Sequence, residues 1–306
     1  MKVSEVGFGC WAIGGNDHGN SYGPTDDKLS LEALHKAIEL GCNFFDTADV
    51  YGWGHSEELL GKAIKGKREH LIIATKVGGD FYQGPGFQTF TPEYIEFALH
   101  KSLERLKTDY IDVYQLHNPP LKLLKLPETY EILKELKRDG KIRAWGVSIF
   151  DPTEGLTVLR TAQPDSLQVA LNLFTKKPEE ELIPRAYEAG CAIIAREPLA
   201  NGFLSGKYNP DSLFESGDVR HRWPRDYIRA RSHAAKRLNQ YLPIDIGSLS
   251  KMALKYVLAN DKISVVIPGT KTAEQAAENF DASDCRNLTK EELSVVSELQ
   301  ARRFTA

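Results

Sequence analysis

Short runs of apolar residues recur along the chain, and each is followed by a stretch in which apolar residues return at helical spacing. Short apolar runs bounded by turn signals are typical of buried strands, and a spacing of three or four is typical of amphipathic helices. The expected strands are 6–13, 43–48, 71–77, 110–117, 142–149, 166–172, 192–199 and 264–270. The expected helices are 27–40, 55–65, 92–106, 127–138, 154–162, 178–189, 248–258 and 272–280, with an amphipathic tail helix at about 289–303.

The order of these elements favours a barrel. The strand runs are continuously apolar, as expected for parallel strands that are covered by helices. Thr91 precedes Pro92 at an expected helix start, and Gly41 and Gly190 stand where helices should end before a strand. Eight strand–helix units without a polar linker between them predict a (β/α)8 TIM barrel, a single α/β domain over residues 1–306.

One segment interrupts this rhythm. Residues 201–247 contain no clear strand, and the next expected strand begins at 264. The segment is too aromatic for disorder, because it contains Phe203, Tyr208, Phe214, Trp223 and Tyr227. We therefore expect a structured excursion, a long loop over the C-terminal mouth of the barrel. Lysine and arginine residues gather within 218–238, and this pattern favours a solvated helix face.

Composition excludes several classes of protein. The formal net charge of −3 gives no global basic field for nucleic acid. No apolar stretch approaches the length of a membrane span, so we expect no membrane partner. The four cysteines form no CxxC pair, which indicates free thiols in a reducing compartment and predicts a cytoplasmic protein.

Four polar side chains stand at the ends of consecutive expected strands. Asp46 and Tyr51 follow the second strand, Lys76 ends the third, and His117 ends the fourth. In a barrel of this type, chemistry is found at the C-terminal ends of the strands, so all four should point into one mouth. Lys76 is the expected partner of Asp46, since each would otherwise be a costly lone charge.

The same arrangement predicts a proton donor. A free tyrosine titrates near pH ~10, and a cation at about 4 Å in partly buried surroundings attracts the phenolate by roughly 4 kcal/mol. We therefore expect Lys76 to lower the pKa of Tyr51 towards the range that suits acid catalysis. Such an acid suits carbonyl reduction, in which it protonates the carbonyl oxygen as hydride reaches carbon. His117 could orient the substrate and polarise the same oxygen.

These residues carry a resemblance to a known family. The segments DTADVYG (46–52), ATKVG (74–78) and VYQLHNP (113–119) resemble the aldo-keto reductases. Matches at GVSIF (146–150), LQVALNLF (167–174), PLANGFLSGKY (198–208) and IPGTKTAEQAAEN (267–279) extend the resemblance over most of the chain. The resemblance implies that Tyr51 is the general acid/base, that Lys76 lowers its pKa, that Asp46 holds Lys76, and that His117 orients the carbonyl.

The resemblance also implies an extended nicotinamide dinucleotide on the barrel mouth. Ser148 and Gln168 should hold the carboxamide, and Arg196 stands where many relatives stack an aromatic ring on the nicotinamide. The loop at 198–208 should cover the pyrophosphate, with Pro198, Leu199, Leu204, Ser205 and Lys207 nearest. Glu278 and Asn279 should meet the adenine. Two departures from the family are Ile149, where relatives usually have Asn, and Gln275, where some have Arg.

Local chemistry supports the adenosine end independently. Gly269 and Thr270 precede an expected helix start, where backbone N–H groups favour phosphate, and Lys271 adds a charge that suits a 2′-phosphate. We therefore expect NADP(H), with NAD(H) as the alternative. Trp11 should line both the cofactor and the substrate sites, and Trp53 and His117 should meet the substrate. That substrate should be a small carbonyl compound or sugar, and the protein a monomer or weak oligomer.

Two other functions stay open at this point. The same barrel occurs in auxiliary subunits of ion channels, where it binds NADPH and turns over poorly. A metal-dependent hydrolase could use Asp46, Asp49, His55, Glu57 and His117, although the sequence contains no HxH or HExxH pattern and we expect no metal.

Overall fold

A barrel of eight parallel strands forms the centre of the computed structural model, which describes residues 1–18 and 21–304. The strands are β1 (Phe8–Gly9), β2 (Phe44–Asp46), β3 (Ile72–Val77), β4 (Ile111–His117), β5 (Ile142–Ser148), β6 (Ser166–Ala170), β7 (Ala192–Arg196) and β8 (Val265–Ile267). Each strand pairs in parallel with the next. Single bridges from Val6 to Val266 and from Gly9 to Gly269 close the barrel between β1 and β8.

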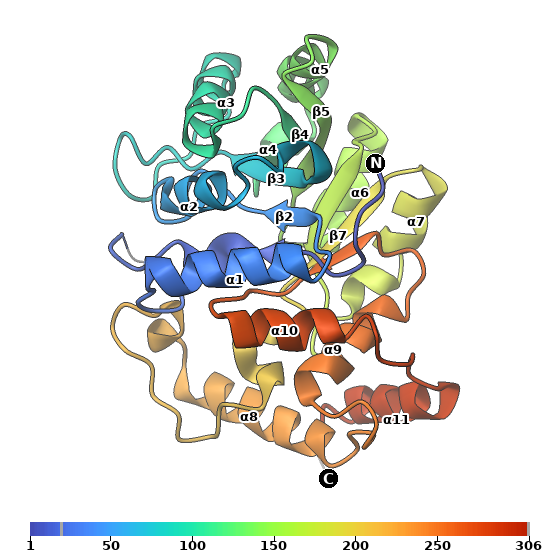
Figure 1. Ribbon diagram of the computed structural model, residues 1–306. Coiled ribbons are helices and arrows are strands. Elements are labelled where there is room, and N and C mark those ends of the chain that lie inside the picture. Colours follow the sequence, from blue (N-terminus) through green and yellow to red (C-terminus); the bar gives the residue numbers. More distant parts are fainter. Residues whose placement is uncertain (19–20, 305–306) are drawn as a thin grey trace.

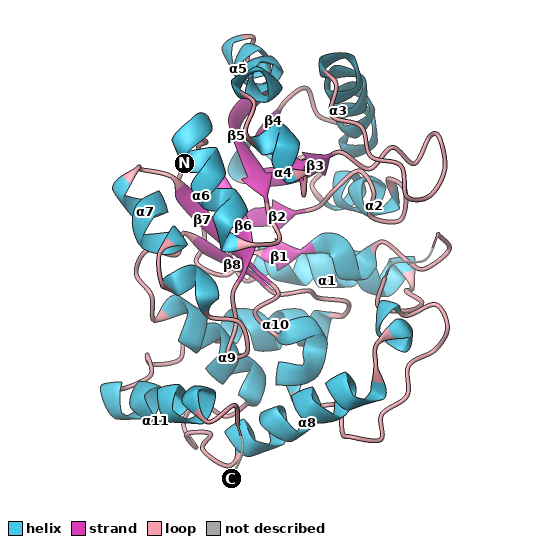
Figure 2. Cartoon of the chain, turned by 180° about the vertical axis from the view of Figure 1, so that it is seen from behind, coloured by secondary structure: helices cyan, strands magenta, loops and turns pink. Residues whose placement is uncertain are grey.

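Helices cover the outside of this sheet (Figures 1 and 2). They are α1 (Asp27–Glu39), α2 (His55–Ala63), α3 (Pro92–Leu106), α4 (Leu121–Leu124), α5 (Glu131–Arg138), α6 (Pro152–Thr161), α7 (Leu182–Glu188), α8 (Arg225–Asn239), α9 (Leu249–Leu258), α10 (Ala273–Asp281) and α11 (Lys290–Ala301). Short 3₁₀ helices are η1 (Cys10–Ile13), η2 (Arg68–His70), η3 (Pro127–Tyr130), η4 (Lys177–Glu179), η5 (Ala200–Ser205) and η6 (Val219–Arg222). The (β/α)8 fold expected from the sequence is confirmed.

Local sequence signals explain several helix boundaries. Thr91 accepts a hydrogen bond from the Tyr94 backbone N–H at the start of α3, with Pro92 in the first turn. Gly41 and Gly190 both have positive φ after a helix, the backbone conformation that glycine adopts without steric cost. The predicted stops before β2 and β7 are therefore observed with their physical cause.

The inside of the barrel changes from apolar to polar along its axis. A cluster of inner side chains is formed by Phe44, Ile72, Ala74, Val113, Ala144, Ile194, Val265 and Ile267, with Val3 packed against it. Because side chains alternate along a strand, the next inward position lies two residues further on. In three neighbouring strands this step leads from an apolar residue to Asp46, Lys76 and Gln115, respectively. Polar side chains therefore gather at the C-terminal mouth, above an apolar floor.

The predicted C-terminal boundary of the first strand was wrong. The strand was predicted to continue to Ile13, but Cys10–Ile13 form the 3₁₀ helix η1. Cys10, Ala12 and Ile13 are buried, so their apolar character reflects burial and not an extended backbone. After η1 the chain passes close to the loop after β2, where a Cβ on Gly14 would lie 3.0 Å from the Tyr51 carbonyl carbon.

The segment between β7 and α9 contains η5, η6 and the long helix α8. Helix α8 packs against α9 and η5 and buries Ile228, Ala235 and Leu238. Of its lysine and arginine residues, Arg229 and Lys236 are exposed, and Arg225, Arg231 and Arg237 are half-buried. The expected solvated helix face is therefore present in α8 only in part. Arg220 departs from that expectation, because it is only 5% exposed and pairs with Asp218.

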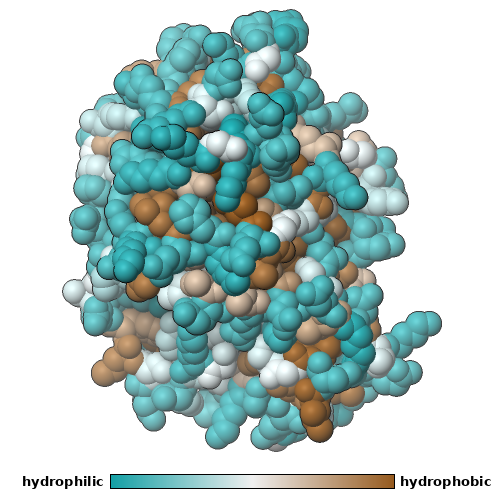
Figure 3. Space-filling view, in the orientation of Figure 1, coloured by the Kyte–Doolittle hydropathy of each residue, from teal (hydrophilic) through white to brown (hydrophobic). Residues whose placement is uncertain are grey.

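The outer surface of the molecule is mostly polar on the face drawn in Figure 3, with apolar side chains in scattered patches. Within residues 1–18 and 21–304, no helix combines the length and apolar character that crossing a bilayer requires.

Candidate active site

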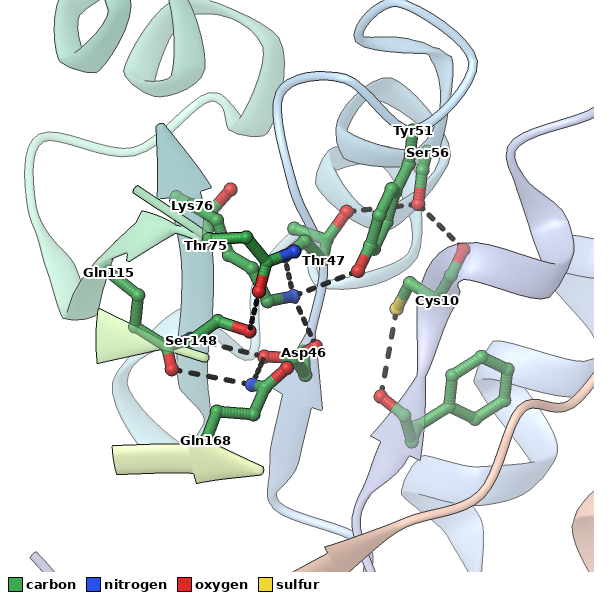
Figure 4. A network of polar contacts seen from close by, with 12 residues as sticks. Cys10, Asp46, Thr47, Tyr51, Ser56, Thr75, Lys76, Gln115, Ser148 and Gln168 are labelled. Carbon is green, nitrogen blue, oxygen red and sulfur yellow. Dashed lines mark hydrogen bonds and ion pairs between the residues drawn. The ribbon is translucent and has the colours of Figure 1, made fainter. Parts of the chain in front are cut away.

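An ion pair between Lys76 and Asp46 lies at the mouth of the barrel (Figure 4). The Lys76 Nζ donates to Asp46 Oδ1 at 2.5 Å, to the Thr47 carbonyl oxygen at 2.8 Å and to Tyr51 Oη at 3.1 Å. The Lys76 side chain has no exposed surface and that of Asp46 is 3% exposed. An ammonium has three hydrogens, so all of them are used. The partnership that the sequence predicted is therefore observed.

The loop after β2 brings Tyr51 back to Lys76. Ser56 Oγ donates to the Cys10 carbonyl oxygen at 2.9 Å and lies 2.9 Å from Thr47 Oγ1, so it fastens this loop to η1. Gly52 has φ of 61°, and a Cβ there would lie 1.9 Å from the Gly14 carbonyl oxygen. Only glycine fits such a position, which explains the glycine that follows Tyr51.

Burial and the neighbouring charges together set the pKa of Tyr51. Burial raises the pKa of Tyr51, and this effect exceeds the lowering by Lys76, while Asp46 raises it further. The sequence-based expectation of a lowered pKa is therefore wrong for this pocket: Lys76 shares its charge with Asp46, and burial disfavours the phenolate. Burial pulls down the pKa of Lys76, but Asp46 and Tyr51 more than offset this and raise it. The site thus holds a phenol beside an ammonium.

His117 faces the ring of Tyr51. The two ring centroids are 5.8 Å apart and the planes meet at 80°. Burial, together with the nearby charges of Lys76 and Arg196, holds the pKa of His117 well below its usual value. The imidazole is therefore neutral near pH 7, and it offers one N–H donor and one acceptor nitrogen.

The second carboxylate oxygen of Asp46 has two partners that the sequence analysis did not anticipate. Gln168 Nε2 donates to Asp46 Oδ2 at 2.7 Å, and Gln115 Nε2 does so at 3.3 Å. The sequence analysis assigned Gln168 to the cofactor carboxamide and missed Gln115. The alternation within β4 could have found it, because Gln115 lies two residues before His117 and faces the same interior.

A cavity of about 430 Å³ opens beside Tyr51 and is within the size range of small-molecule sites. Of the residues expected at the cofactor, those that line it are Trp11, Ser148, Gln168, Arg196, Pro198, Leu199, Ser205, Lys207, Gly269, Lys271, Gln275, Glu278 and Asn279. Lining residues that the sequence analysis missed include Tyr22, Asn118, Phe150, Glu197, Asn201, Tyr208 and Arg220. Asn118 and Glu197 directly follow His117 and Arg196 at strand ends, so the strand pattern could have found them, whereas Tyr22 and Arg220 come from distant loops and have no local signal.

Four predicted residues do not line this cavity: Lys76, which lies behind Tyr51, and Trp53, Leu204 and Thr270. Leu204 and Thr270 are fully buried. Thr270 Oγ1 accepts a hydrogen bond from Asn279 Nδ2 at 3.0 Å, so it supports the wall from behind. The Trp53 ring stacks with the rings of His18 and Phe81, with centroids 4.1 and 5.7 Å away. Trp53 lies outside this cavity, and its contact with a substrate stays a prediction.

Arg196 is a half-buried cation in the cavity wall. It pairs with Glu197, and its Nη2 donates to the Ile149 carbonyl oxygen at 3.1 Å. Its Nε is buried and has no hydrogen-bond partner among the described residues. Burial lowers the pKa of Arg196 from its usual value. Arg196 thus places a guanidinium where an aromatic ring was expected in relatives.

The far end of the cavity is assembled around Lys271. Its Nζ donates to the Tyr22 carbonyl oxygen at 2.7 Å and to that of Pro24 at 3.2 Å. The Gln275 side chain accepts from the Lys271 backbone N–H at 2.8 Å. Tyr22 also donates through its hydroxyl to Asn201 Oδ1 at 2.6 Å. Segments almost the whole chain apart therefore meet here.

His55 and Glu57, two of the residues considered as metal ligands, each contact other side chains. His55 Nε2 lies 2.8 Å from Asp27, and Glu57 accepts from Thr75 and from Arg105 at 2.6 and 2.7 Å. Across the described part of the chain, no group of three or more His, Cys, Asp or Glu side chains is arranged to hold a metal ion.

Comparison with known proteins agrees with this geometry. The model of the aldo/keto reductase family matches residues 5–301. The protein named uncharacterized oxidoreductase YqkF, from Bacillus subtilis (strain 168), is 35% identical over 97% of this chain and 92% of that protein. A holo form of aldo-keto reductase AKR11C1 from Bacillus halodurans has a TM-score of 0.80 at 34% identity, covering 97% of this chain and 92% of that one. The glycerol dehydrogenase AKR11B4 from Gluconobacter oxydans has a TM-score of 0.82 at 31% identity, covering 99% and 94%. With a family match over nearly its whole length and a shared barrel, the chain belongs to the aldo/keto reductase family.

Proposed function

We propose that this protein interconverts small aldehydes, ketones or sugar carbonyls and their alcohols with NADP(H), and that Tyr51 is its general acid/base. One observation carries the proposal: Tyr51 Oη lies 3.1 Å from the Lys76 ammonium at the edge of the cavity. A phenol held against a buried cation can release a proton and remain stabilised as the phenolate. Family membership supports the redox chemistry.

The residues present fit a nicotinamide dinucleotide. The cavity runs from Tyr51 to Gly269 and Glu278, and it is lined by hydroxyl, amide and cationic side chains. The orphaned Nε of Arg196 supplies a donor that the described residues leave unused. Ser148 and Gln168 would hold the nicotinamide end, and Lys207 and Lys271 would hold phosphates. When bound, such a cofactor supplies or accepts the hydride.

The protein's own groups then handle the proton. The Tyr51 hydroxyl protonates the carbonyl oxygen, and in the reverse direction the phenolate takes the proton from the alcohol. Lys76 stays protonated throughout, because Asp46 holds it in that form. Neutral His117 can donate its N–H to the same oxygen and so fix the direction of the carbonyl. Trp11, Val50 and Phe150 contribute apolar surface to the cavity lining.

We infer a preference for NADP(H) from Lys271. Two of its three N–H donors go to backbone carbonyl oxygens, which leaves one for a 2′-phosphate and holds the ammonium in place. Fluorescence titration should show tighter binding of NADPH than of NADH, and Lys271→Met should remove most of that difference. Equal affinity of the unmodified protein for both cofactors would contradict the assignment.

The acid/base assignment is tested by Tyr51→Phe, which removes only the hydroxyl. Turnover on a panel of aldehydes and ketones should fall by about 10²–10⁴-fold, the range for general acid–base catalysis, while NADPH still binds. A comparable loss of NADPH affinity would show that the hydroxyl has a structural role. Cofactor binding by the unmodified protein without turnover on any carbonyl would favour the auxiliary-subunit alternative.

A further inference from the structure

Gln115 lies behind the proposed catalytic residues and has no exposed surface. Strand β4 carries it, in register with Lys76 of β3 and Gly146 of β5. Its Nε2 donates to Asp46 Oδ2 at 3.3 Å, and its Oε1 accepts from Gln168 Nε2 at 3.3 Å. Gln115 is absent from the cavity lining, so it acts only through these two neighbours.

The chemistry of Asp46 fixes the direction of both amides. An ionised carboxylate only accepts hydrogen bonds, so Gln115 and Gln168 must both turn their nitrogen atoms towards it. Gln168 then spends one N–H on Asp46 and the other on Gln115 Oε1. The group that Gln168 has left for the cavity is its carbonyl oxygen, an acceptor.

We propose that Gln115 is a positioning residue that couples the Asp46–Lys76 ion pair to the nicotinamide end of the cavity. Gln115 donates a hydrogen bond to Asp46 Oδ2 and accepts one from the Gln168 amide. It thereby orients Gln168 so that Gln168 Oε1 faces a donor such as the NH₂ group of a carboxamide. The proposal rests on the proposed function, because it assigns Gln115 a role in cofactor placement and turnover.

Gln115→Glu tests the coupling through pH. Burial and the neighbouring Asp46 will raise the pKa of the introduced carboxyl group. Below that pKa, its O–H can donate to Asp46 and its carbonyl oxygen can accept from Gln168, as the amide did. The variant should then retain kcat and NADPH affinity within about 3-fold of the unmodified protein. Above that pKa, a second carboxylate faces Asp46. Both kcat and NADPH affinity should then fall by about 10-fold, because a 10-fold change corresponds to about one pKa unit of interaction energy.

Gln115→Met removes both hydrogen bonds with little change in length. We expect about a 10-fold loss of NADPH affinity at every pH, equal to roughly one unit of pKa in free energy. Affinity for 2′,5′-ADP, which lacks the nicotinamide, should stay unchanged. Gln240→Met, at the exposed end of α8, is the matched control and should leave both affinities unchanged.

The outcomes separate this proposal from the function on which it rests. Turnover and the Tyr51→Phe variant are measured in parallel, and failure there rejects the proposed function. If Tyr51→Phe behaves as expected but both Gln115 variants match the unmodified protein, the positioning role is rejected. Equal losses for NADPH and 2′,5′-ADP, or identical pH profiles for the two Gln115 variants, would assign Gln115 to fold stability alone.

Discussion

The two ends of the cavity are built in different ways. At the Tyr51 end, the polar side chains come from neighbouring strands in register, and most contacts are made inside the barrel. At the Lys271 end, loops that are far apart in the sequence meet, and Tyr22, Asn201 and Arg220 hold one another. The comparison teaches that the sheet fixes the reacting end, whereas the far end depends on a few long-range contacts between loops.

Removing the buried cation at the reacting end should have the largest effect. Lys76→Met leaves Asp46 buried without its ammonium, so the free energy of unfolding should fall by about 3–5 kcal/mol. Turnover should fall by about 10²–10⁴-fold, while the Kd for NADPH changes little. Urea denaturation and steady-state kinetics measure the two quantities. Adding Asp46→Asn should restore part of the stability and none of the turnover; a double variant that turns over normally would exclude the proposed role of the pair.

Removing the buried cation at the far end should give the opposite pattern. Arg220 donates to Asp218, to the Asn201 carbonyl oxygen at 2.9 Å and to Tyr208 Oη at 2.8 Å. Arg220→Met should weaken NADPH binding by about 10-fold, equivalent to about 1.4 kcal/mol, with kcat at saturating cofactor within a few-fold of normal. Arg222→Met, on the exposed side of η6, is the control. A fall in kcat without a change in the Kd for NADPH would show that Arg220 acts on turnover, as Lys76 does, and would contradict the proposed difference between the two ends.

A backbone substitution sharpens the comparison further. Gly52→Ala places a Cβ against the Gly14 carbonyl oxygen at a residue with positive φ. The free energy of unfolding should fall by about 1–2 kcal/mol because of the left-handed conformation, and further because of the clash. The kcat should also fall, because Tyr51 moves. Gly66→Ala is a matched control, since Gly66 also has positive φ but nothing lies within 4 Å of its Cβ. Equal destabilisation by both substitutions would show that the close approach is unimportant.

His117 contributes a pH dependence to the stability of the folded protein. Its folded-state pKa is depressed, so the unfolded chain binds this proton first as the pH falls. Above about pH 6.5, the neutral His117 does not oppose folding. As the pH falls from there towards the folded-state pKa, the free energy of unfolding should decrease by at most about 1.4 kcal/mol per pH unit. Urea denaturation between pH 5 and 7 should show a shallower slope for His117→Gln. An unchanged slope would mean that the ring is not held neutral.

The sequence predicted the fold and the reacting end for the same reason. Apolar runs and helix signals are local, and a residue at a strand end is placed by the strand itself, which is why Asp46, Lys76 and His117 were found together. Side chains behind that layer, such as Gln115, follow only when the inward alternation is traced along each strand.

At the far end, the sequence predicted Lys271 and its neighbours but missed Tyr22 and Arg220, because contacts between distant segments place them. Tyr22 and Lys271 are brought together by a hydrogen bond across 249 positions, and no pattern near either residue records it. The pKa of Tyr51 was mispredicted for a related reason. Burial is a property of the whole pocket, and it outweighed the one neighbouring charge that the sequence revealed.

The three committed hydrogens of Lys76 have a consequence for an enzyme that handles aldehydes. A primary amine with a free lone pair condenses with an aldehyde to form an imine. Lys76 has no lone pair to offer, because its pKa is raised and each hydrogen is held by an oxygen. A reactive carbonyl can therefore sit beside this nitrogen through many turnovers without forming a Schiff base, and amine-directed reagents should modify exposed lysines while sparing this one.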